Sequence, residues 1–249
     1  MSDPGRELPD LELIFVHIPK TAGNTLMNVL VHTYGRDRVC FYGEDLPRRK
    51  GPVTATELAP ATRVLMGHFT FRQLAALYRP QRHRLITFLR EPRARYISHF
   101  FHLKRLQENA NPGLLDRVRV HEPFAVYLLW LQYHNQISRY LAGVELSDLD
   151  YVGTVERFEE DILMLAELMG WDREAVKGVL SWAPRVNVNT SIPASRQRVS
   201  PLYDPFIRFA NRTDIEIYSS ALSASRSGDN EVLSSRSERP HTPSRPGSR

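Results

Sequence analysis

The side chains best suited to chemistry in this sequence stand close together near its start. Residues 19–25 read PKTAGNT and follow a short apolar run, LIFV, at residues 13–16. The ammonium group of Lys20 and the hydroxyl groups of Thr21 and Thr25 suit an anion, most naturally phosphate. Helical spacing begins directly after them, so backbone N–H groups and the positive end of a helix dipole would point at the same spot. The pattern predicts a phosphate-binding loop; an ordinary strand–helix turn with a solvated lysine is the alternative.

A second group of candidate residues follows the apolar run RLITFLR at residues 84–90. Arg90 ends this run, Pro92 stands where a first helical residue is expected, and Ser98 falls in the second turn. A guanidinium group placed there can bind a phosphate in a bidentate manner near the helix N-terminus, and the Ser98 hydroxyl could reach the same anion. Taken alone, these residues would be better explained as an ion-pair residue and a surface serine.

The candidate general base is His68, which follows a glycine in VLMGHF at residues 64–69. A neutral imidazole accepts a proton near pH 7. A structural histidine bonded to the edge of a sheet is the alternative. His17 and His99 flank the two predicted phosphate motifs and are rival bases.

These candidates must be positioned by a sheet. Short apolar runs alternate with stretches of helical spacing, which predicts βαβ units and a mainly parallel sheet covered by helices on both faces. The expected strands are residues 13–16, 39–42, 63–68, 84–90 and 151–155. Ligands bind outside the carboxyl ends of such strands, so Lys20, His68 and Arg90 should meet at one edge of the sheet.

The remaining pattern divides the chain into three parts. Residues 1–10 are a polar lead-in, residues 11–222 form a single α/β domain, and residues 223–249 form a tail rich in serine, arginine and proline. The composition of the tail predicts disorder. Further helices are expected up to Tyr34, after Pro92, and over residues 69–77, 122–141, 158–169, 171–182, 205–210 and 213–222. The last begins with Thr213 and Glu216 at capping-box spacing.

The composition is that of a globular protein, with 42% hydrophobic and 24% charged residues. No apolar run approaches the roughly 20 residues that span a bilayer, and the opening MSDPGRELPD does not read as a signal peptide. The single cysteine, Cys40, excludes an internal disulfide. We therefore expect a cytoplasmic protein without a transmembrane segment. The net charge of +5 suits anionic ligands and is too small to indicate a nucleic-acid-binding protein.

The two phosphate motifs together resemble a known family. PKTAGNT is similar to the 5′-phosphosulfate loop of sulfotransferases that use 3′-phosphoadenosine 5′-phosphosulfate (PAPS), and LREPRARYISHF to their 3′-phosphate segment. The resemblance is to the carbohydrate sulfotransferases related to heparan sulfate 2-O-sulfotransferase, in a soluble bacterial-type form, and spans roughly residues 12–222. Asn24 departs from the family's usual Thr or Ser. The resemblance implies a P-loop-like three-layer fold with a mainly parallel central sheet flanked by helices.

The resemblance also implies roles for individual residues. Lys20 would stabilise the leaving phosphate, and His68 would be the base. Arg90 and Ser98 would bind the 3′-phosphate, and the 5′-phosphosulfate would be held, partly through backbone groups, by Lys20, Thr21, Ala22, Gly23, Asn24 and Thr25. Asn135 and Arg139 would line the acceptor side, and residues 187–191 would form a loop over the nucleotide. No metal is required, and no His/Cys/Asp cluster shows metal-ligand spacing.

The sequence thus predicts a sulfotransferase that moves a sulfuryl group from PAPS to a hydroxyl of a carbohydrate or glycoconjugate. One alternative is a kinase that uses ATP. It would need the GxxxxGK[ST] loop, whereas Lys20 precedes Gly23 here. The other alternative is a nucleotide-binding protein without turnover, which the departure at Asn24 from the family's usual Thr or Ser would favour. The loops at 43–55 and 107–121 are expected to form the acceptor pocket, and the basic stretch LPRRKGP at 46–52 would meet an acidic acceptor or be a solvated loop.

Overall fold

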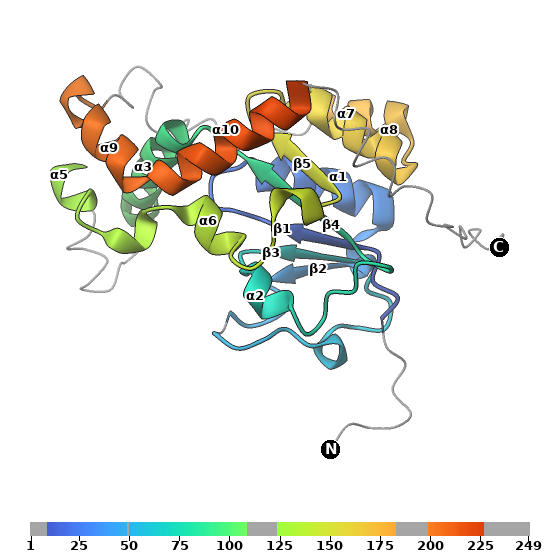
Figure 1. The fold of residues 1–249 in the computed structure, drawn as a ribbon. Helices are drawn as coiled ribbons and strands as arrows, with labels where there is room; N and C mark the ends of the chain where they lie inside the picture. Colours follow the sequence, from blue (N-terminus) through green and yellow to red (C-terminus); the bar gives the residue numbers. More distant parts are fainter. Residues whose placement is uncertain (1–8, 49, 109–123, 183–198, 227–249) are drawn as a thin grey trace, which may run out of the picture.

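A five-stranded sheet in which every pair of neighbours is parallel forms the centre of the molecule (Figure 1). The computed structural model describes residues 9–48, 50–108, 124–182 and 199–226. Its strands are β1 (Leu13–Val16), β2 (Val39–Tyr42), β3 (Val64–Gly67), β4 (Arg84–Leu89) and β5 (Tyr151–Thr154), in the order β2-β3-β1-β4-β5. The predicted parallel sheet is confirmed.

Helices connect and cover these strands. They are α1 (Gly23–Tyr34), α2 (Phe71–Leu74), α3 (Pro92–Glu108), α5 (Phe124–Tyr127), α6 (Gln136–Tyr140), α7 (Phe158–Met169), α8 (Arg173–Trp182), α9 (Asp204–Ala210) and α10 (Arg212–Arg226). Short 3₁₀ turns are η1 (Arg36–Arg38), η2 (Ala55–Glu57), η3 (Leu131–Tyr133), η4 (Leu146–Asp148) and η6 (Pro201–Tyr203). None of the described helices is long and apolar enough to cross a membrane.

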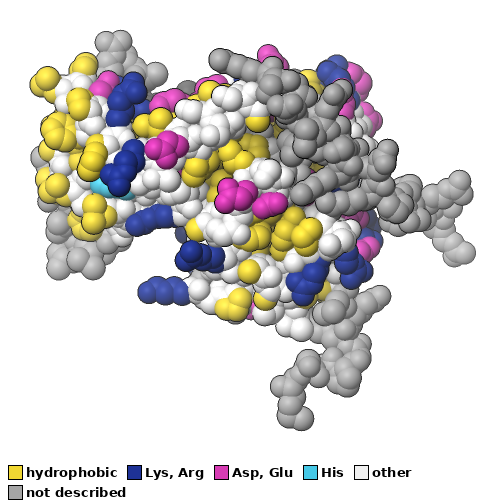
Figure 2. Space-filling model, in the orientation of Figure 1, with side chains coloured by type: hydrophobic (Ala, Val, Ile, Leu, Met, Phe, Trp, Pro, Cys, Tyr) yellow, Lys and Arg dark blue, Asp and Glu magenta, His cyan; other side chains and the backbone are white. Residues whose placement is uncertain are grey.

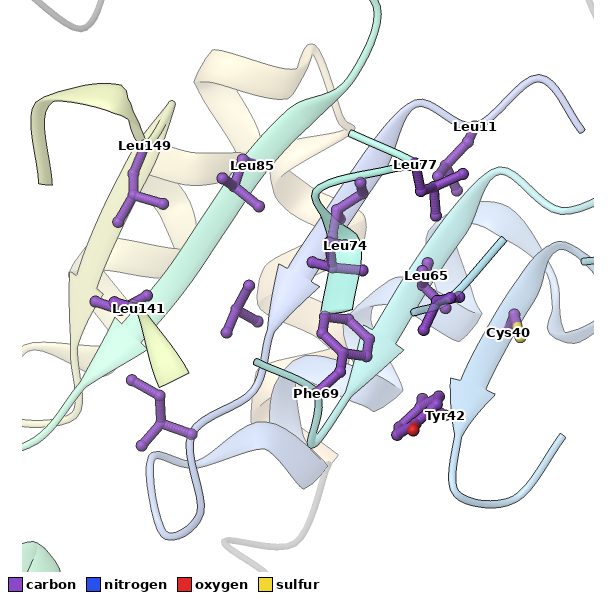
Figure 3. Packing of buried hydrophobic residues seen from close by; sticks show 14 of the residues in the cluster. Leu11, Cys40, Tyr42, Leu65, Phe69, Leu74, Leu77, Leu85, Leu141 and Leu149 are labelled. Atoms are coloured by element: carbon purple, nitrogen blue, oxygen red, sulfur yellow. The ribbon is translucent and has the colours of Figure 1, made fainter. Parts of the chain in front are cut away.

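Both faces of the sheet are apolar because alternate residues of each strand point to opposite sides. On β1, Leu13 and Phe15 belong to a core that includes residues of α1, α7 and α8. Ile14 and Val16 belong to the opposite core, to which α2, α6 and α10 contribute (Figure 3). The result is the predicted three-layer arrangement of helices, sheet and helices.

A third apolar cluster lies beyond the sheet and is mostly aromatic. It joins α3, α5 and α9 through Tyr96, Phe100, Phe101, Phe124, Tyr127 and Ile207. Rings within it pack edge-on or tilted, as for Phe100 and Phe124 at 4.9 Å. This cluster fixes α3, which begins directly after β4, beside the carboxyl edge of the sheet.

The single helix predicted over residues 122–141 is wrong. The described part of this stretch, from Phe124 on, contains α5, η3 and α6, and it turns sharply at Asn135, whose φ of 44° lies in the left-handed region. The fold-back brings Tyr127 and Tyr133 into a stacked contact at 5.1 Å. It is also closed by His134, whose Nε2–H donates to the Leu128 carbonyl oxygen at 2.8 Å. The apolar residues of this stretch therefore pack into the aromatic cluster from several short elements, and do not form one face of a continuous helix.

Two other expected boundaries differ from the structure. The helix expected over residues 69–77 is reduced to α2. The last helix begins at Arg212, so Thr213 lies inside it and is not its capping residue. The same helix runs to Arg226, and the rest of the expected tail lies outside the described residues.

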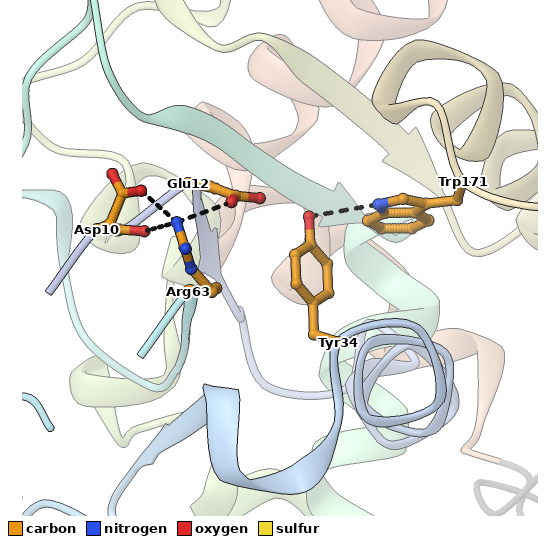
Figure 4. Close-up of polar contacts among 5 residues, drawn as sticks. All are labelled: Asp10, Glu12, Tyr34, Arg63 and Trp171. Atoms are coloured by element: carbon orange, nitrogen blue, oxygen red, sulfur yellow. Dashed lines mark hydrogen bonds and ion pairs between the residues drawn. The ribbon is translucent and has the colours of Figure 1, made fainter. Parts of the chain in front are cut away.

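Contacts at the opposite end of the sheet tie the start of β1 to that of β3, and α1 to the α7–α8 connection (Figure 4). The Arg63 guanidinium forms ion pairs with Asp10 and, at 3.2 Å, with Glu12. The indole N–H of Trp171 donates to the hydroxyl of Tyr34 at 3.3 Å, which joins the end of α1 to the α7–α8 connection. The loop between β1 and α1 is therefore anchored on both sides.

Candidate active site

The carboxyl ends of β1, β3 and β4 meet at one edge of the sheet and bring three of the predicted residues together. The Nη1 atom of Arg90 lies 3.4 Å from the backbone oxygen of Lys20. His68 and Lys20 both line a cavity of about 360 Å³ at this edge. The expectation that Lys20, His68 and Arg90 share an edge is therefore confirmed.

The loop between β1 and α1 has a backbone suited to an anion. Lys20 and Ala22 have φ values of 74° and 60°, in the left-handed region that non-glycine residues seldom adopt. No acceptor among the described residues is recorded for the backbone N–H groups of Ala22, Gly23 and Asn24. Successive free N–H groups at such a turn, directly before a helix, form a concave site for an anion.

Both threonines of the loop, Thr21 and Thr25, are buried. The Thr21 hydroxyl donates to the Ile18 carbonyl oxygen at 2.8 Å, inside the protein, and so fixes the shape of the loop instead of pointing at a ligand. Thr25 is buried, and its backbone N–H donates to the Ala22 oxygen. Neither side chain lines the cavity, whereas Lys20, Ala22, Gly23 and Asn24 do.

Gly23 is required by a close approach within the loop. A Cβ atom at this position would lie 2.1 Å from the ring of His17. The His17 ring is itself held between Phe15, at 5.4 Å, and His68, at 4.4 Å between ring centroids. The glycine thus allows the half-buried imidazole of His17 to pack against the loop.

The start of α3 differs from the expected second anion site. Glu91 caps this helix, since its carboxylate accepts from the N–H groups of Arg93 at 2.9 Å and Ala94 at 2.7 Å. These N–H groups are therefore engaged, and an anion here would rely on side chains. Arg90 is available at the end of β4, and Ser98 is half-buried on the second turn of α3.

Hydrogen bonds distinguish His68 from the other histidines of the cavity. Its Nδ1 lies 2.7 Å from the His17 carbonyl oxygen, which can only accept, so Nδ1 carries the proton and Nε2 has a free lone pair. In His102 the assignment is reversed. Its Nδ1 accepts from Nη2 of Arg105 at 3.0 Å, so its Nε2 carries the proton. Nε2 of His68 can accept a proton, and Nε2 of His102 cannot.

The two rival bases line the same cavity. The pKa of His17 is lowered well below its usual value by burial and then by the neighbouring His68 and Lys20. Burial also lowers the pKa of His99 to about 3, and its Nδ1 is bonded to the Tyr127 hydroxyl at 2.8 Å. The pKa of His68 is lowered by burial as well, while its bond to the His17 carbonyl raises it. His68 is therefore neutral at pH 7.

The cavity is dominated by positive charge. Lys20, Arg48 and Arg105 line it, Arg90 lies at its edge, and no carboxylate is among the lining residues that the structure describes. Burial, followed by repulsion from Arg105 and Arg90, lowers the pKa of Lys20 to about 8. Mutual repulsion of this kind is relieved when an anion enters.

Several lining residues were not predicted from the sequence. His102, Arg105 and Tyr140 were missed, and Arg48 was noted only as part of a basic loop. The spacing of three between His99, His102 and Arg105 places them on one side of α3, which is a signal that could have been used. Despite the four histidines, the described residues contain no group of three or more potential ligands that could hold a metal ion.

Two residues expected on the acceptor side lie elsewhere. Asn135 is bonded to Asn211 and Asp214 in a buried polar network next to α6. Arg139 is exposed, and its Nη1 donates to the Gln132 carbonyl oxygen. Neither lines the cavity. The loop expected at residues 187–191 lies outside the described residues.

Comparison with known proteins decides the family. A model described as "Sulfotransferase family" matches residues 8–209. The chain belongs to the sulfotransferase family. No curated protein matches this sulfotransferase.

Solved structures resemble the chain at low sequence identity. The crystal structure of mouse sulfotransferase SULT7A1 complexed with PAP has a TM-score of 0.52 and 13% identity, and covers 92% of this chain and 89% of the mouse chain. A sulfotransferase from Alicyclobacillus acidocaldarius has a TM-score of 0.37 and 17% identity, with 94% and 97% covered. The first likeness shows that this sulfotransferase has the fold of that protein.

Proposed function

We propose that this sulfotransferase moves a sulfuryl group from PAPS to a hydroxyl of a carbohydrate or glycoconjugate. The observation that carries the proposal is the approach of the Arg90 guanidinium to 3.4 Å from the backbone oxygen of Lys20. It lies beside three successive N–H groups, those of residues 22–24, that have no recorded partner among the described residues. A nucleotide with phosphates at both ends of its ribose needs two such cationic groups at one edge. The PAP bound in the mouse structure supports the same donor.

In the proposed reaction, the acceptor oxygen forms a bond to sulfur as the bond from sulfur to the 5′-phosphate oxygen breaks. Lys20 and the loop N–H groups stabilise the charge that develops on the departing phosphate. The proton of the acceptor hydroxyl passes to Nε2 of His68, the nitrogen left free by the bond to the His17 carbonyl. Arg90 and Ser98 hold the 3′-phosphate. No step calls for a metal ion.

The charge of the cavity favours an acceptor that is itself acidic. With Lys20 and Arg90 assigned to the donor, Arg48 and Arg105 remain as cationic side chains of the lining. Arg48 comes from the basic stretch at residues 46–52, for which an acidic acceptor was one of two interpretations. A carbohydrate that carries carboxylate or sulfate groups would pair with these guanidinium groups.

The decisive experiment measures transfer from labelled PAPS by Lys20→Ala and Arg90→Ala. Loss of one preorganised charged donor costs about 10²–10³-fold in rate, so both variants should be nearly inactive against a panel of glycan hydroxyls. Lys177→Ala, which removes an exposed lysine on α8, is the matched control and should transfer at the normal rate. Full activity in either test variant would overturn the proposal.

Calorimetry separates the two alternatives. A kinase would bind ATP with Mg²⁺ more tightly than PAP, whereas the proposed enzyme binds PAP and is indifferent to Mg²⁺. A nucleotide-binding protein without turnover would bind PAP tightly and transfer sulfate to none of the acceptors in the panel. Whether or not the protein turns over, its binding of PAP should depend on Lys20 and Arg90.

A further inference from the structure

A patch of large apolar side chains is exposed on the unit formed by α5, η3, η6 and α9. Five side chains make up this apolar patch, and each is between 63% and 81% exposed: Leu129, Leu131, Leu202, Phe206 and Phe209. Elsewhere in the described residues the only exposed large apolar side chains are Trp182 on α8, at 62%, and Met164 on α7, at 37%. Figure 2 shows apolar side chains gathered over α5 and α9, at the left of the view.

The helix α9 carries both buried and exposed apolar side chains. Ile207 and Ala210 are buried against the molecule, and Ile207 belongs to the aromatic cluster. Phe206 and Phe209 point outward instead of the polar residues that a surface helix normally presents. The rings of Phe124 and Tyr203, 5.3 Å apart, join α5 to η6, so the apolar patch is carried by one packed unit.

Positive charge borders the apolar patch. Arg208 and Arg212 are exposed, and the guanidinium group of Arg212 lies 5.1 Å from the ring centroid of Phe209. No ion-pair partner among the described residues is recorded for either arginine. Of the neighbouring acids, Asp204 is paired with Arg93 at 2.7 Å, and Glu216 is exposed one turn further along α10. Exposed apolar rings bordered by arginine are typical of segments that lie at the surface of an anionic bilayer.

We propose that the apolar patch docks this protein onto the surface of an anionic lipid bilayer. A second copy of the chain fits less well, because a two-fold interface places the same patch on both sides, and both sides would then carry the positive charge of Arg208 and Arg212. A bilayer supplies both parts of the complement, an apolar interior for the phenylalanines and anionic headgroups for the arginines. The inference does not depend on the proposed transfer reaction.

Docking would also set how the cavity is oriented relative to the bilayer. The helix α3 separates the two sites: its Tyr96 and Phe100 belong to the cluster beneath the apolar patch, and its His99 and His102 line the cavity.

The test is flotation of the full chain with vesicles of phosphatidylcholine, with and without phosphatidylglycerol. Binding should be stronger to the anionic vesicles and should weaken as salt is added. The double variant Phe206→Ser/Phe209→Ser should reduce the partition coefficient about tenfold or more, because two buried rings are lost from the bilayer. Arg208→Gln/Arg212→Gln should abolish the preference for anionic vesicles.

Trp182→Ser is the matched control, because it removes an equally exposed aromatic ring away from the apolar patch. It should bind vesicles as the unaltered protein does. Far-ultraviolet circular dichroism checks that each variant is folded. The proposal is overturned if the unaltered protein does not float with anionic vesicles, or if the phenylalanine double variant floats equally well. It is also overturned if light scattering shows a dimer that the double variant dissociates while vesicle binding is absent.

Discussion

At the scale of single residues, the contact between Gly23 and the His17 ring determines the shape of the anion loop. Gly23→Ala should abolish PAP binding measured by calorimetry, because the added Cβ would lie 2.1 Å from a ring that is held on both sides. The strain of such overpacking is about 1–3 kcal/mol, so the variant should still fold. Gly178→Ala on α8, where an added Cβ meets nothing within 4 Å, is the control and should bind normally.

The ionisation of Lys20 and His68 predicts a bell-shaped pH profile for kcat/KM. Below the lowered pKa of His68 the ring is protonated and cannot accept the acceptor's proton, so activity should rise with pH on the acidic side. Above about 8, Lys20 loses its proton in the free enzyme and no longer attracts the donor, so activity should fall.

Substitutions show which residue causes each side of the pH profile. Lys20→Arg keeps its charge at alkaline pH, so its falling limb should disappear even though its rate is lower. His68→Ala should be slow and lack the acidic limb, while His102→Ala should keep both limbs. A falling limb near pH 8 that persists in Lys20→Arg would contradict the assignment of that limb to Lys20.

At the scale of elements, a buried polar network joins α3, α6 and α10. The Asp214 carboxylate accepts from the N–H groups of Ile137 and Ser138, both at 2.9 Å, and so caps α6 from another helix. Nearby, Arg95 is completely buried; its Nη2 donates to the Tyr133 oxygen and to Asn211, whereas its Nε and Nη1 have no partner in the described part of the chain. The network therefore positions α6, which carries Tyr140 into the cavity.

Asp214→Ala should lower the free energy of unfolding by about 2–5 kcal/mol, because the N–H groups of Ile137 and Ser138 lose their acceptor and Arg95 loses a counter-charge. Urea denaturation measures this loss. Asp172→Ala is the control. Asp172 also accepts from two N–H groups, those of Glu174 and Ala175, but it is exposed, so its loss should cost about 1 kcal/mol. Equal losses for the two variants would show that burial of the network does not matter.

At the scale of the whole molecule, binding of PAP should stabilise the fold. A ligand present at 100 times its Kd adds about 2.7 kcal/mol, which for a domain of this size raises Tm by about 5–10 °C. Differential scanning fluorimetry should show this shift with PAP and not with ATP and Mg²⁺. The shift should vanish in Arg90→Ala. A larger shift with ATP and Mg²⁺ would favour the kinase alternative instead.

The sheet and its edge could be predicted from the sequence because they rest on local signals. Runs such as residues 13–16 are apolar on both faces, and Lys20, His68 and Arg90 stand directly after such runs. The capping of α3 by Glu91 and the bond from Thr21 to Ile18 depend on side-chain orientation, which spacing does not reveal. The break at Asn135 could not be predicted for another reason: its partners, Asn211 just before α10 and Asp214 on α10, lie more than 70 residues away.

The position of β1 in the middle of the sheet has a consequence for how the chain acquires its structure. β1 lies between β3 and β4, so its backbone partners are 51 and 71 residues further along the chain, as in the pairs of Leu13 with Val64 and Arg84. A ribosome must release most of the first hundred residues before this strand can be enclosed, and pairings at such separation form slowly. Until then LIFV remains an apolar segment without neighbours, which makes the early nascent chain the stage most in need of a chaperone.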